Sequence, residues 1–298
     1  MQSAKIRAAL LASPPIILIA LFVGLPVVSA VLYTFGHTGG MNSVVAQIAQ
    51  HQYVADHWWG TVGAYRNVFA TGSFWHSLLD TVLVTVCATA LVLVLGGGVA
   101  LYLRLSGGWL SKVVSLLAVV PLFIPVVIAS YAILVFYAPD GFVGSVCQLL
   151  GWPDAPVLSY TMVGVTIGQV WVNLPLGVLL LSSAFTSVPD VLIDAARDAG
   201  APMTRVIRSV LLPMSALPAV IVATFTAISV LGSFTVPFLI GPSAPNMLGP
   251  EMANTFGPFN QPQQAEVMAV VVFLLAVGAG VYYVRANFRA SKRSGASR

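Results

Sequence analysis

Six long runs of apolar residues constrain the fold of this chain more than any other feature of its sequence. They cover roughly residues 13–35, 76–103, 112–137, 160–185, 214–240 and 265–285. Gly232 and Pro237 interrupt the fifth run, and its end is expected to unwind there. About 20 apolar residues are enough for a helix to cross the hydrocarbon core of a bilayer. The runs lack the residue-by-residue alternation of a transmembrane barrel. The predicted fold class is therefore an all-α integral membrane protein with six transmembrane helices.

The composition excludes a soluble globular fold. Of the 298 residues, 58% are hydrophobic and 7% are charged, whereas soluble domains carry about 25% charged residues. The first run resembles a signal peptide, because Lys5 and Arg7 precede it and the sequence VSA lies near its end. Since this run continues through Tyr33 and five more runs follow, we expect a retained helix.

The basic residues predict the orientation of the six helices. If every run spans the membrane, all Lys and Arg residues except Arg66 fall on one side. These residues are Lys5, Arg7, Arg104, Lys112, Arg197, Arg205, Arg208, Arg285, Arg289, Lys292, Arg293 and Arg298. Cytoplasmic loops carry such an excess, so both termini are expected in the cytoplasm. The pI of about 9.2 then reflects membrane topology, and no nucleic-acid partner is expected.

One membrane domain is predicted over residues 13–288, with cytoplasmic ends at 1–12 and 289–298. The chain has two cysteines and four histidines. Their positions suggest neither a disulfide framework nor a metal site.

The loop at 187–213 is unusual because it holds six of the 22 charged residues of an apolar chain. Its first half reads as a capped helix. Ser187 is a suitable N-cap, Pro189 falls in the first turn, and Asp190 completes a capping-box pattern. Asp190, Asp194 and Asp198 have i, i+4, i+8 spacing and are predicted to form one acidic stripe.

The second half of the loop predicts a bend and another short helix. Gly200 is placed for a left-handed residue after the helix, and Pro202 prevents the helix from continuing. A second helix can begin near Thr204, and Pro213 marks where it ends or bends into the next run. Helices this short are marginal alone in water. The loop is therefore either docked on its own helix bundle or held by a partner protein, and its residues alone do not decide between these alternatives.

The sequence DAARDAGAPMTRVIRSVLLP, from Asp194 to Pro213, resembles the EAA loop of ABC importer permeases. Ala195, Ala196, Gly200 and Pro213 match that motif at its spacing. Asp194 replaces the leading Glu of the family, and Ala199 stands where an acid sometimes occurs, with Asp198 one position earlier. The form of the motif is most similar to the spermidine/putrescine branch, and we call residues 187–213 the coupling loop.

The resemblance extends over roughly residues 60–285. GAYRNVFATGSFWHSLLDTVLVTV, from Gly63 to Val86, is similar to the segment by which the family enters its second helix. GSFTVPFLIG, from Gly232 to Gly241, resembles a segment of the polyamine branch. The resemblance implies a type I importer fold in a bacterial inner (plasma) membrane, with no catalytic residues in this chain.

The resemblance also implies partners and a site. The coupling loop would dock on a cytoplasmic ABC ATPase dimer. This chain lacks a G-x-x-x-x-G-K-[ST] loop, so ATP and Mg would bind to that dimer. A second permease subunit, related or identical, and an extracytoplasmic substrate-binding protein would complete the importer in the bilayer. The implied contact residues are Asp194, Ala195, Ala196, Asp198, Gly200, Ala201, Arg205 and Pro213. The implied cargo is a polyamine or similar small solute, with sugar, phosphonate, thiamine and ferric iron as alternatives.

Four polar or aromatic residues are candidates for the translocation path, namely Asp80, Tyr131, Gln169 and Asn173. An acid in a span is a functional candidate, but Asp80 could instead complement a helix dipole, as could Glu266. Gln169 and Asn173 either line a polar path or form interhelical hydrogen bonds. Tyr131 either stacks on cargo or packs. A secondary transporter or channel is the alternative class, although no inverted repeat is evident.

Overall fold

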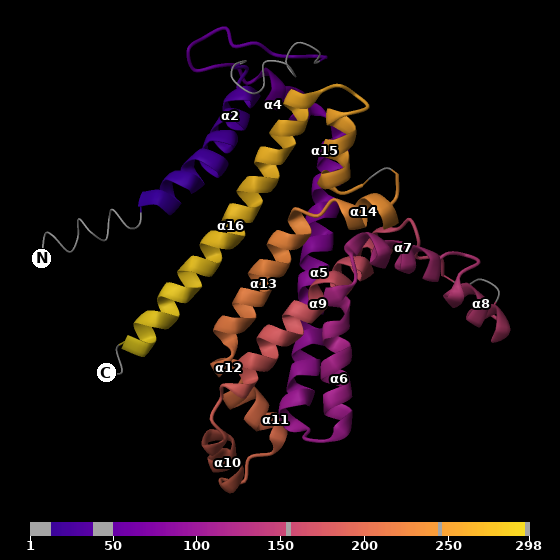
Figure 1. The fold of residues 1–298 in the computed structure, drawn as a ribbon, viewed down its shortest axis with the longest axis vertical. Coiled ribbons are helices and arrows are strands. Elements are labelled where there is room, and N and C mark those ends of the chain that lie inside the picture. The colour runs from indigo at the N-terminus through magenta and orange to yellow at the C-terminus, as the bar shows by residue number, and fades with distance from the viewer. Residues whose placement is uncertain (1–12, 38–49, 153–155, 244–245, 296–298) are drawn as a thin grey trace, which may run out of the picture. The chain divides into compact units, whose positions relative to one another are not determined.

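The computed structural model describes residues 13–37, 50–152, 156–243 and 246–295, with side chains up to residue 288. The regular structure in these ranges is helical, without a strand (Figure 1). The elements are η1 (Ala20–Gly24), α2 (Leu25–Thr34), α4 (Gly63–Ala70), α5 (Gly72–Leu105), α6 (Trp109–Val119), η3 (Val120–Phe123), α7 (Val126–Phe136), α8 (Phe142–Leu149), α9 (Met162–Thr186), α10 (Asp190–Asp198), α11 (Met203–Val206), η4 (Ile207–Leu211), α12 (Leu212–Met214), α13 (Ala216–Leu231), α14 (Thr235–Ile240), α15 (Leu248–Phe256) and α16 (Pro262–Gly295). The predicted cytoplasmic end at 1–12 lies outside the described residues.

Four described helices are long and apolar enough to cross a membrane. They are Ser13–Thr34, Gly72–Leu105, Met162–Thr186 and Pro262–Phe288. Two pairs of helices meet this test only together, because each is bent at a short break. The six predicted runs therefore correspond to four continuous helices and two bent pairs. The number of spans is six if each bent pair is one span.

The third predicted run is not one continuous helix. Trp109–Phe123 and Val126–Phe136 meet at an angle of 109°, so the predicted span over 112–137 is a bent pair of helices. Proline disfavours the helical conformation of the residue before it. Ile124, before Pro125, is accordingly extended, with φ −97° and ψ 119°.

The fifth predicted run has the interruption that its glycine indicated. Helix α13 ends at Leu231, Gly232 follows as its C-cap, and α14 begins at Thr235. At the other end, Met203–Met214 and Ala216–Leu231 are bent by 66°. The predicted bend near Pro213 is thus confirmed. The last helix, α16, is longer than predicted and continues through the polar segment to Gly295.

The chain divides into two compact units, and unit 1 comprises Met1–Trp75 and Glu251–Val271. The buried side chain of Gln263 helps to connect its separate segments. Its Nε2 donates to the carbonyl oxygens of Tyr33 (3.0 Å) and Tyr53 (2.9 Å). Its Oε1 accepts from the backbone N–H of Tyr53 (2.8 Å). The start of α16 is thereby tied to the end of α2 and to the backbone of Tyr53, in the segment between α2 and α4.

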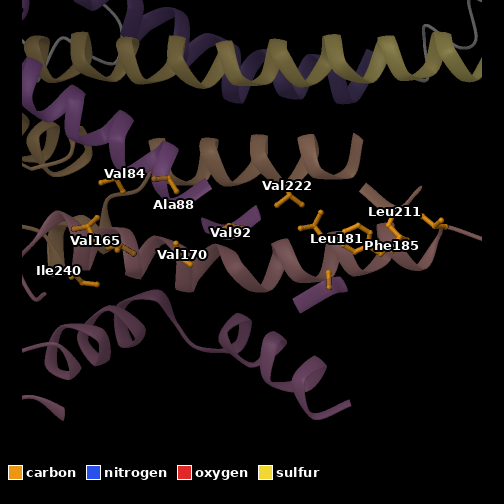
Figure 2. Packing of buried hydrophobic residues seen from close by; sticks show 14 of the residues in the cluster. Val84, Ala88, Val92, Val165, Val170, Leu181, Phe185, Leu211, Val222 and Ile240 are labelled. Atoms are coloured by element: carbon orange, nitrogen blue, oxygen red, sulfur yellow. The ribbon is translucent and has the colours of Figure 1, made fainter. Parts of the chain in front are cut away.

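Unit 2 comprises His76–Pro250 and Val272–Arg298, and α9 is its central helix. Helix α9 packs against α6, α7, α13 and α14. Elements α10 to α12 lie at one end of α9, and α7 and α14 lie at the opposite end (Figure 1). Figure 2 shows the core of this unit, which combines residues of α5, α9 and α13. The labelled members include Val84, Ala88, Val92, Val165, Val170, Leu181, Phe185 and Val222.

Glycines allow these helices to approach closely. A Cβ at Gly177 of α9 would lie 2.7 Å from Cγ1 of Val92 and 3.5 Å from Cγ1 of Val222. A Cβ at Gly96 would lie 3.5 Å from the backbone of Gly177. The run Gly96-Gly97-Gly98 on α5 thus contributes to close helix packing at its first residue. Gly98, by contrast, has open space around it.

Gly177→Ala is expected to destabilise the protein, whereas Gly98→Ala is expected not to. The methyl group at position 177 overpacks the core, at a cost of about 1–3 kcal/mol. At position 98 it only improves helix propensity, by about 0.5–1 kcal/mol. Thermal unfolding in detergent should therefore show a lower midpoint for Gly177→Ala, by roughly 2–4 °C per kcal/mol. Equal midpoints for the two variants would contradict this packing.

Candidate functional site

The coupling loop folds as the predicted helix, bend and second helix. The first helix is α10, and the second combines α11, η4 and α12 over Met203–Met214. The loop lies at the end of α9, outside the packed spans of unit 2 (Figure 1). It therefore extends from the central helix of that unit.

The predicted cap of α10 is wrong. Helix α10 begins at Asp190 with Pro189 as its N-cap, and no side chain caps it. Ser187 instead ends α9, where its Oγ donates to the carbonyl oxygen of Ala184 (2.7 Å). Its hydroxyl is therefore directed back to the helix that it terminates.

Arg104 occupies the junction between α9 and α10. Its Nε donates to the carbonyl oxygen of Phe185 (3.0 Å), and its Nη2 donates to that of Val188 (3.1 Å). The same Nη2 forms an ion pair with Asp190. In the sequence, Arg104 served only to predict the orientation of the helices in the membrane. The overlooked signal was an isolated arginine near the end of an apolar helix.

The bend has the conformation that glycine favours. Gly200 has φ +79°, as predicted. Its N–H donates to the carbonyl oxygen of Arg197 (2.8 Å), and the N–H of Ala201 donates to that of Ala196 (3.0 Å). These two bonds form a Schellman motif. The motif alanine at 196 thus supplies a backbone acceptor that closes the bend.

The coupling loop has an apolar underside that belongs to the core of unit 2. Its buried members are Val188, Ile193, Val206 and Leu211, and they share one cluster with Phe185. The partly buried residues packed against this cluster include Ala196, Ala201 and Met203. The loop is therefore docked on its own bundle, which was one of the two alternatives that the sequence left open.

The opposite face of the coupling loop is exposed. The exposed motif residues are Asp194, Ala195, Asp198, Gly200, Arg205 and Pro213. A hollow of about 370 Å³ on this face is lined by Pro202, Thr204, Arg205, Arg208 and Ser209. Both acidic and basic groups are thus accessible on a firmly packed support.

The candidate path residues lie on three different helices. Gln169 and Asn173 are buried on α9, and the side-chain amide of Asn173 donates to the carbonyl oxygen of Gln169 (2.8 Å). This bond lies within one helix, whereas the hypothesis was an interhelical one. Tyr131 on α7 is exposed. Asp80 on α5 is half-buried.

The two acids in the long helices are not explained by the helix dipole. That effect is confined to the first turn, and the first turns of α5 and α16 contain no acid. Oδ2 of Asp80 and Oε2 of Glu266 are both buried, without a hydrogen-bond partner among the described residues. The helix-dipole interpretation is therefore wrong for both residues.

One hollow was not anticipated from the sequence. It measures about 380 Å³ and is lined by small and hydroxyl-bearing residues of α5, α13 and α16. Its polar members are Thr85, Thr89, Thr224 and Tyr282. The sequence signal for this hollow was the pair Thr85 and Thr89, four residues apart on an apolar helix.

Among residues with described side chains, no group of three or more His, Cys, Asp or Glu could hold a metal.

Comparison with known proteins decides the family. Residues 92–290 match the family described as "Binding-protein-dependent transport system inner membrane component". The chain belongs to this family. Its members are transport-system components and not enzymes. The predicted location, a multi-pass protein of the bacterial inner membrane, is confirmed, as is the resemblance to ABC importer permeases.

Two curated relatives illustrate the range of this family. The diacetylchitobiose uptake system permease protein DasB of Streptomyces coelicolor is 30% identical over 200 residues, which are 65% of this chain and 58% of DasB. The spermidine/putrescine transport system permease protein PotB of Escherichia coli is 28% identical over 170 residues, which are 56% of this chain and 62% of PotB. The aligned part is thus less than two thirds of either relative.

The fold has a solved counterpart. It is a chain of the bacterial alginate ABC transporter in complex with an alginate pentasaccharide-bound periplasmic protein. The likeness has a TM-score of 0.76 at 16% sequence identity and covers 98% of this chain and 96% of that chain. The predicted type I importer fold of this inner membrane component is therefore confirmed.

Gly200→Val is expected to loosen the coupling loop without unfolding the inner membrane component. No atom lies within 4 Å of where a Cβ would be, so the cost comes from the backbone alone. A left-handed residue with a side chain costs roughly 1–2 kcal/mol, which raises the open population of the bend about tenfold. Trypsin should therefore cleave the detergent-solubilised variant faster at Arg197 and Arg205. Gly200→Asn is the matched control, because Asn tolerates this conformation, and equal cleavage of the two variants would contradict the role of the bend.

Proposed function

We propose that this chain is the permease subunit of an ATP-driven, binding-protein-dependent importer. The observation that carries the proposal is the two-sided coupling loop. Its apolar underside is part of the core, while Asp194, Ala195 and Asp198 face outward. A loop that is fixed on one side and accessible on the other is suited to receive force from a partner.

The proposed partner at this loop is a cytoplasmic ABC ATPase dimer. The chain has no phosphate-binding loop sequence, so ATP and Mg would bind to that partner. Asp194 and Asp198 are exposed, and the one ion pair of the coupling loop among the described residues uses Asp190. A groove that offers positive charge to these two acids would complement the loop.

The remaining partners follow from the same proposal. A second permease subunit, related or identical, would pair with this chain over the ATPase dimer. An extracytoplasmic binding protein would deliver the cargo. The distribution of Lys and Arg supports cytoplasmic termini, and with that orientation the coupling loop would lie on the side of the ATPase.

The mechanism we propose is alternating access. Closure of the ATPase dimer would move the coupling loop, and the helices of unit 2 would follow because α9 ends directly at the loop. Alternating access requires two states whose contacts with ATP and cargo differ. The residues proposed for the path are Asp80, Tyr131, Gln169 and Asn173.

A polyamine is the cargo that we propose, with a sugar as the alternative. The sequence of the coupling loop supports the polyamine branch, and PotB is a spermidine/putrescine permease. Asp80 adds chemical support, because its buried and unpartnered Oδ2 is a suitable acceptor for an ammonium group. DasB, a diacetylchitobiose permease, keeps the sugar alternative open.

Purification of the tagged chain from its host in mild detergent tests the proposed class. We expect an ABC ATPase, a second permease and a binding protein to co-purify. Gly200→Val should reach the membrane at the normal level and lose uptake, while Gly200→Asn retains it. If the chain purifies alone and drives uptake by itself in vesicles, it is a secondary transporter or channel, and the proposal fails.

Asp80→Asn tests the proposed cargo. If Asp80 binds an ammonium group, its neutralisation should raise the KM of spermidine uptake by roughly tenfold or more, the loss expected for a charge-assisted hydrogen bond. The matched control is Glu251→Gln, because Glu251 lies outside the four continuous spans. An unchanged KM, or binding of diacetylchitobiose but not of spermidine by the co-purified binding protein, would contradict the polyamine assignment.

A further inference from the structure

The connection between α9 and the coupling helix α10 is only three residues long. Ser187, Val188 and Pro189 separate Thr186 from Asp190. Pro189 is extended, with φ −61° and ψ 135°. The N–H groups of Ser187 and Val188 bond back to α9, and among the described residues no backbone hydrogen bond joins α9 to α10. The apolar contacts of Val188 and Ile193 hold this region against the core, but because they are non-directional they do not fix the angle between α10 and α9.

Arg104 supplies contacts from a third helix. It lies one residue before the end of α5 and reaches both sides of this junction. Two of its acceptors are the carbonyl oxygens of Phe185, in the last turn of α9, and of Val188, in the connection. The third is the carboxylate of Asp190, the first residue of α10. One guanidinium thus bonds to α9, to the connection and to α10.

The chemistry of each acceptor suits a guanidinium. The end of a helix carries partial negative charge on its free carbonyl groups, which a nearby cation stabilises. Arg104 lies at the ends of both α5 and α9. Its planar fork donates to several acceptors at fixed angles, which a lysine ammonium does not reproduce.

The contacts of Arg104 differ in burial, and therefore in strength. The Arg104 side chain is 16% exposed, whereas the Asp190 side chain is 74% exposed. An exposed ion pair contributes little. The bonds to the carbonyl oxygens are therefore expected to dominate, and Val188 and Phe185 lie buried in the core beneath them.

We propose that Arg104 is a positioning residue that makes α10 and the ends of α5 and α9 move as one rigid body. This proposal rests on the coupling role proposed above. Force applied to the coupling helix then reaches two spans together. Without Arg104, part of that motion is lost as bending at Ser187–Pro189. The contacts of Arg104 given by the described residues all lie within this chain.

The test is the number of ATP molecules hydrolysed per cargo molecule imported by the complete importer in proteoliposomes. Arg104→Met keeps an apolar stem but removes every donor. We expect the ATPase subunit to co-purify with it normally, and uptake per ATP to fall by about tenfold or more, as expected for lost charge-assisted hydrogen bonds. Lys112→Met is the matched control, because Lys112 is an exposed cation on the adjacent helix α6. Lys112→Met should import as much cargo per ATP as the unaltered protein does.

A cross-link separates lost coupling from lost folding. In a background with Cys87→Ser and Cys147→Ser, Arg104→Cys and Asp190→Cys are joined by a short bifunctional thiol reagent. Uptake per ATP should rise again after cross-linking, and a monofunctional reagent should have no such effect. If Arg104→Met does not accumulate in the membrane, uptake per ATP can still be measured in the cross-linked pair and in Arg104→Lys. We expect Arg104→Lys to have an uptake per ATP between that of the unaltered protein and that of a protein without Arg104.

Two outcomes would overturn the assignment. One is normal coupling in Arg104→Met, and the other is a defect that cross-linking does not correct. Failure of the proposed function looks different, because the unaltered chain would then neither co-purify with an ATPase nor import in an ATP-dependent manner.

Discussion

Inside a bilayer no water satisfies a backbone N–H or C=O group, and the fold of this chain depends on that constraint. Continuous helices meet it by themselves. Where a helix ends, side chains from distant segments provide the missing partners. Arg104 donates to two carbonyl oxygens at and just after the end of α9. Gln263 forms hydrogen bonds with three backbone groups, one of Tyr33 in α2 and two of Tyr53. Thr81 likewise accepts from the N–H of Leu248 (2.8 Å) at the start of α15.

The sequence was sufficient for features that depend on nearby residues. The apolar runs predicted the long helices because span length is a property of composition. Gly200 predicted the left-handed bend because conformational freedom belongs to the residue itself. Gly232 and Pro213 predicted the breaks around α13 because glycine and proline are both unfavourable inside a helix.

Features that depend on distant residues were missed. At the predicted cap, the Ser187 hydroxyl bonds back to Ala184, and Asp190 pairs instead with Arg104, which is 86 positions away in the chain. Pro125 marks the place of the bend after Phe123, but the local sequence does not specify its angle of 109°. The roles of Gln169 and Asn173 stayed open for a related reason. Which side of an apolar helix is covered depends on the neighbouring helices.

The coupling loop is docked on its own bundle and still has the accessible charges that the proposed partner would need. Ile193 and Val206 anchor it to the core of its own bundle, and Asp194 and Asp198 remain accessible. A loop that only linked two helices would not need so many buried groups. A loop that only bound a partner would order on binding and lose conformational entropy at that moment. The observed arrangement avoids that loss because the contact surface is already ordered.

The position of Gln263 has a consequence for biosynthesis. It bonds to Tyr33 and Tyr53, which precede it by 230 and 210 residues. A ribosome completes the first helix long before it reaches the last one. The backbone groups of Tyr33 and Tyr53 therefore acquire their final partners only when synthesis is almost finished. Any nascent chain that stops before residue 263 exposes those groups, and a quality-control protease has a chemical basis for distinguishing it from the finished protein.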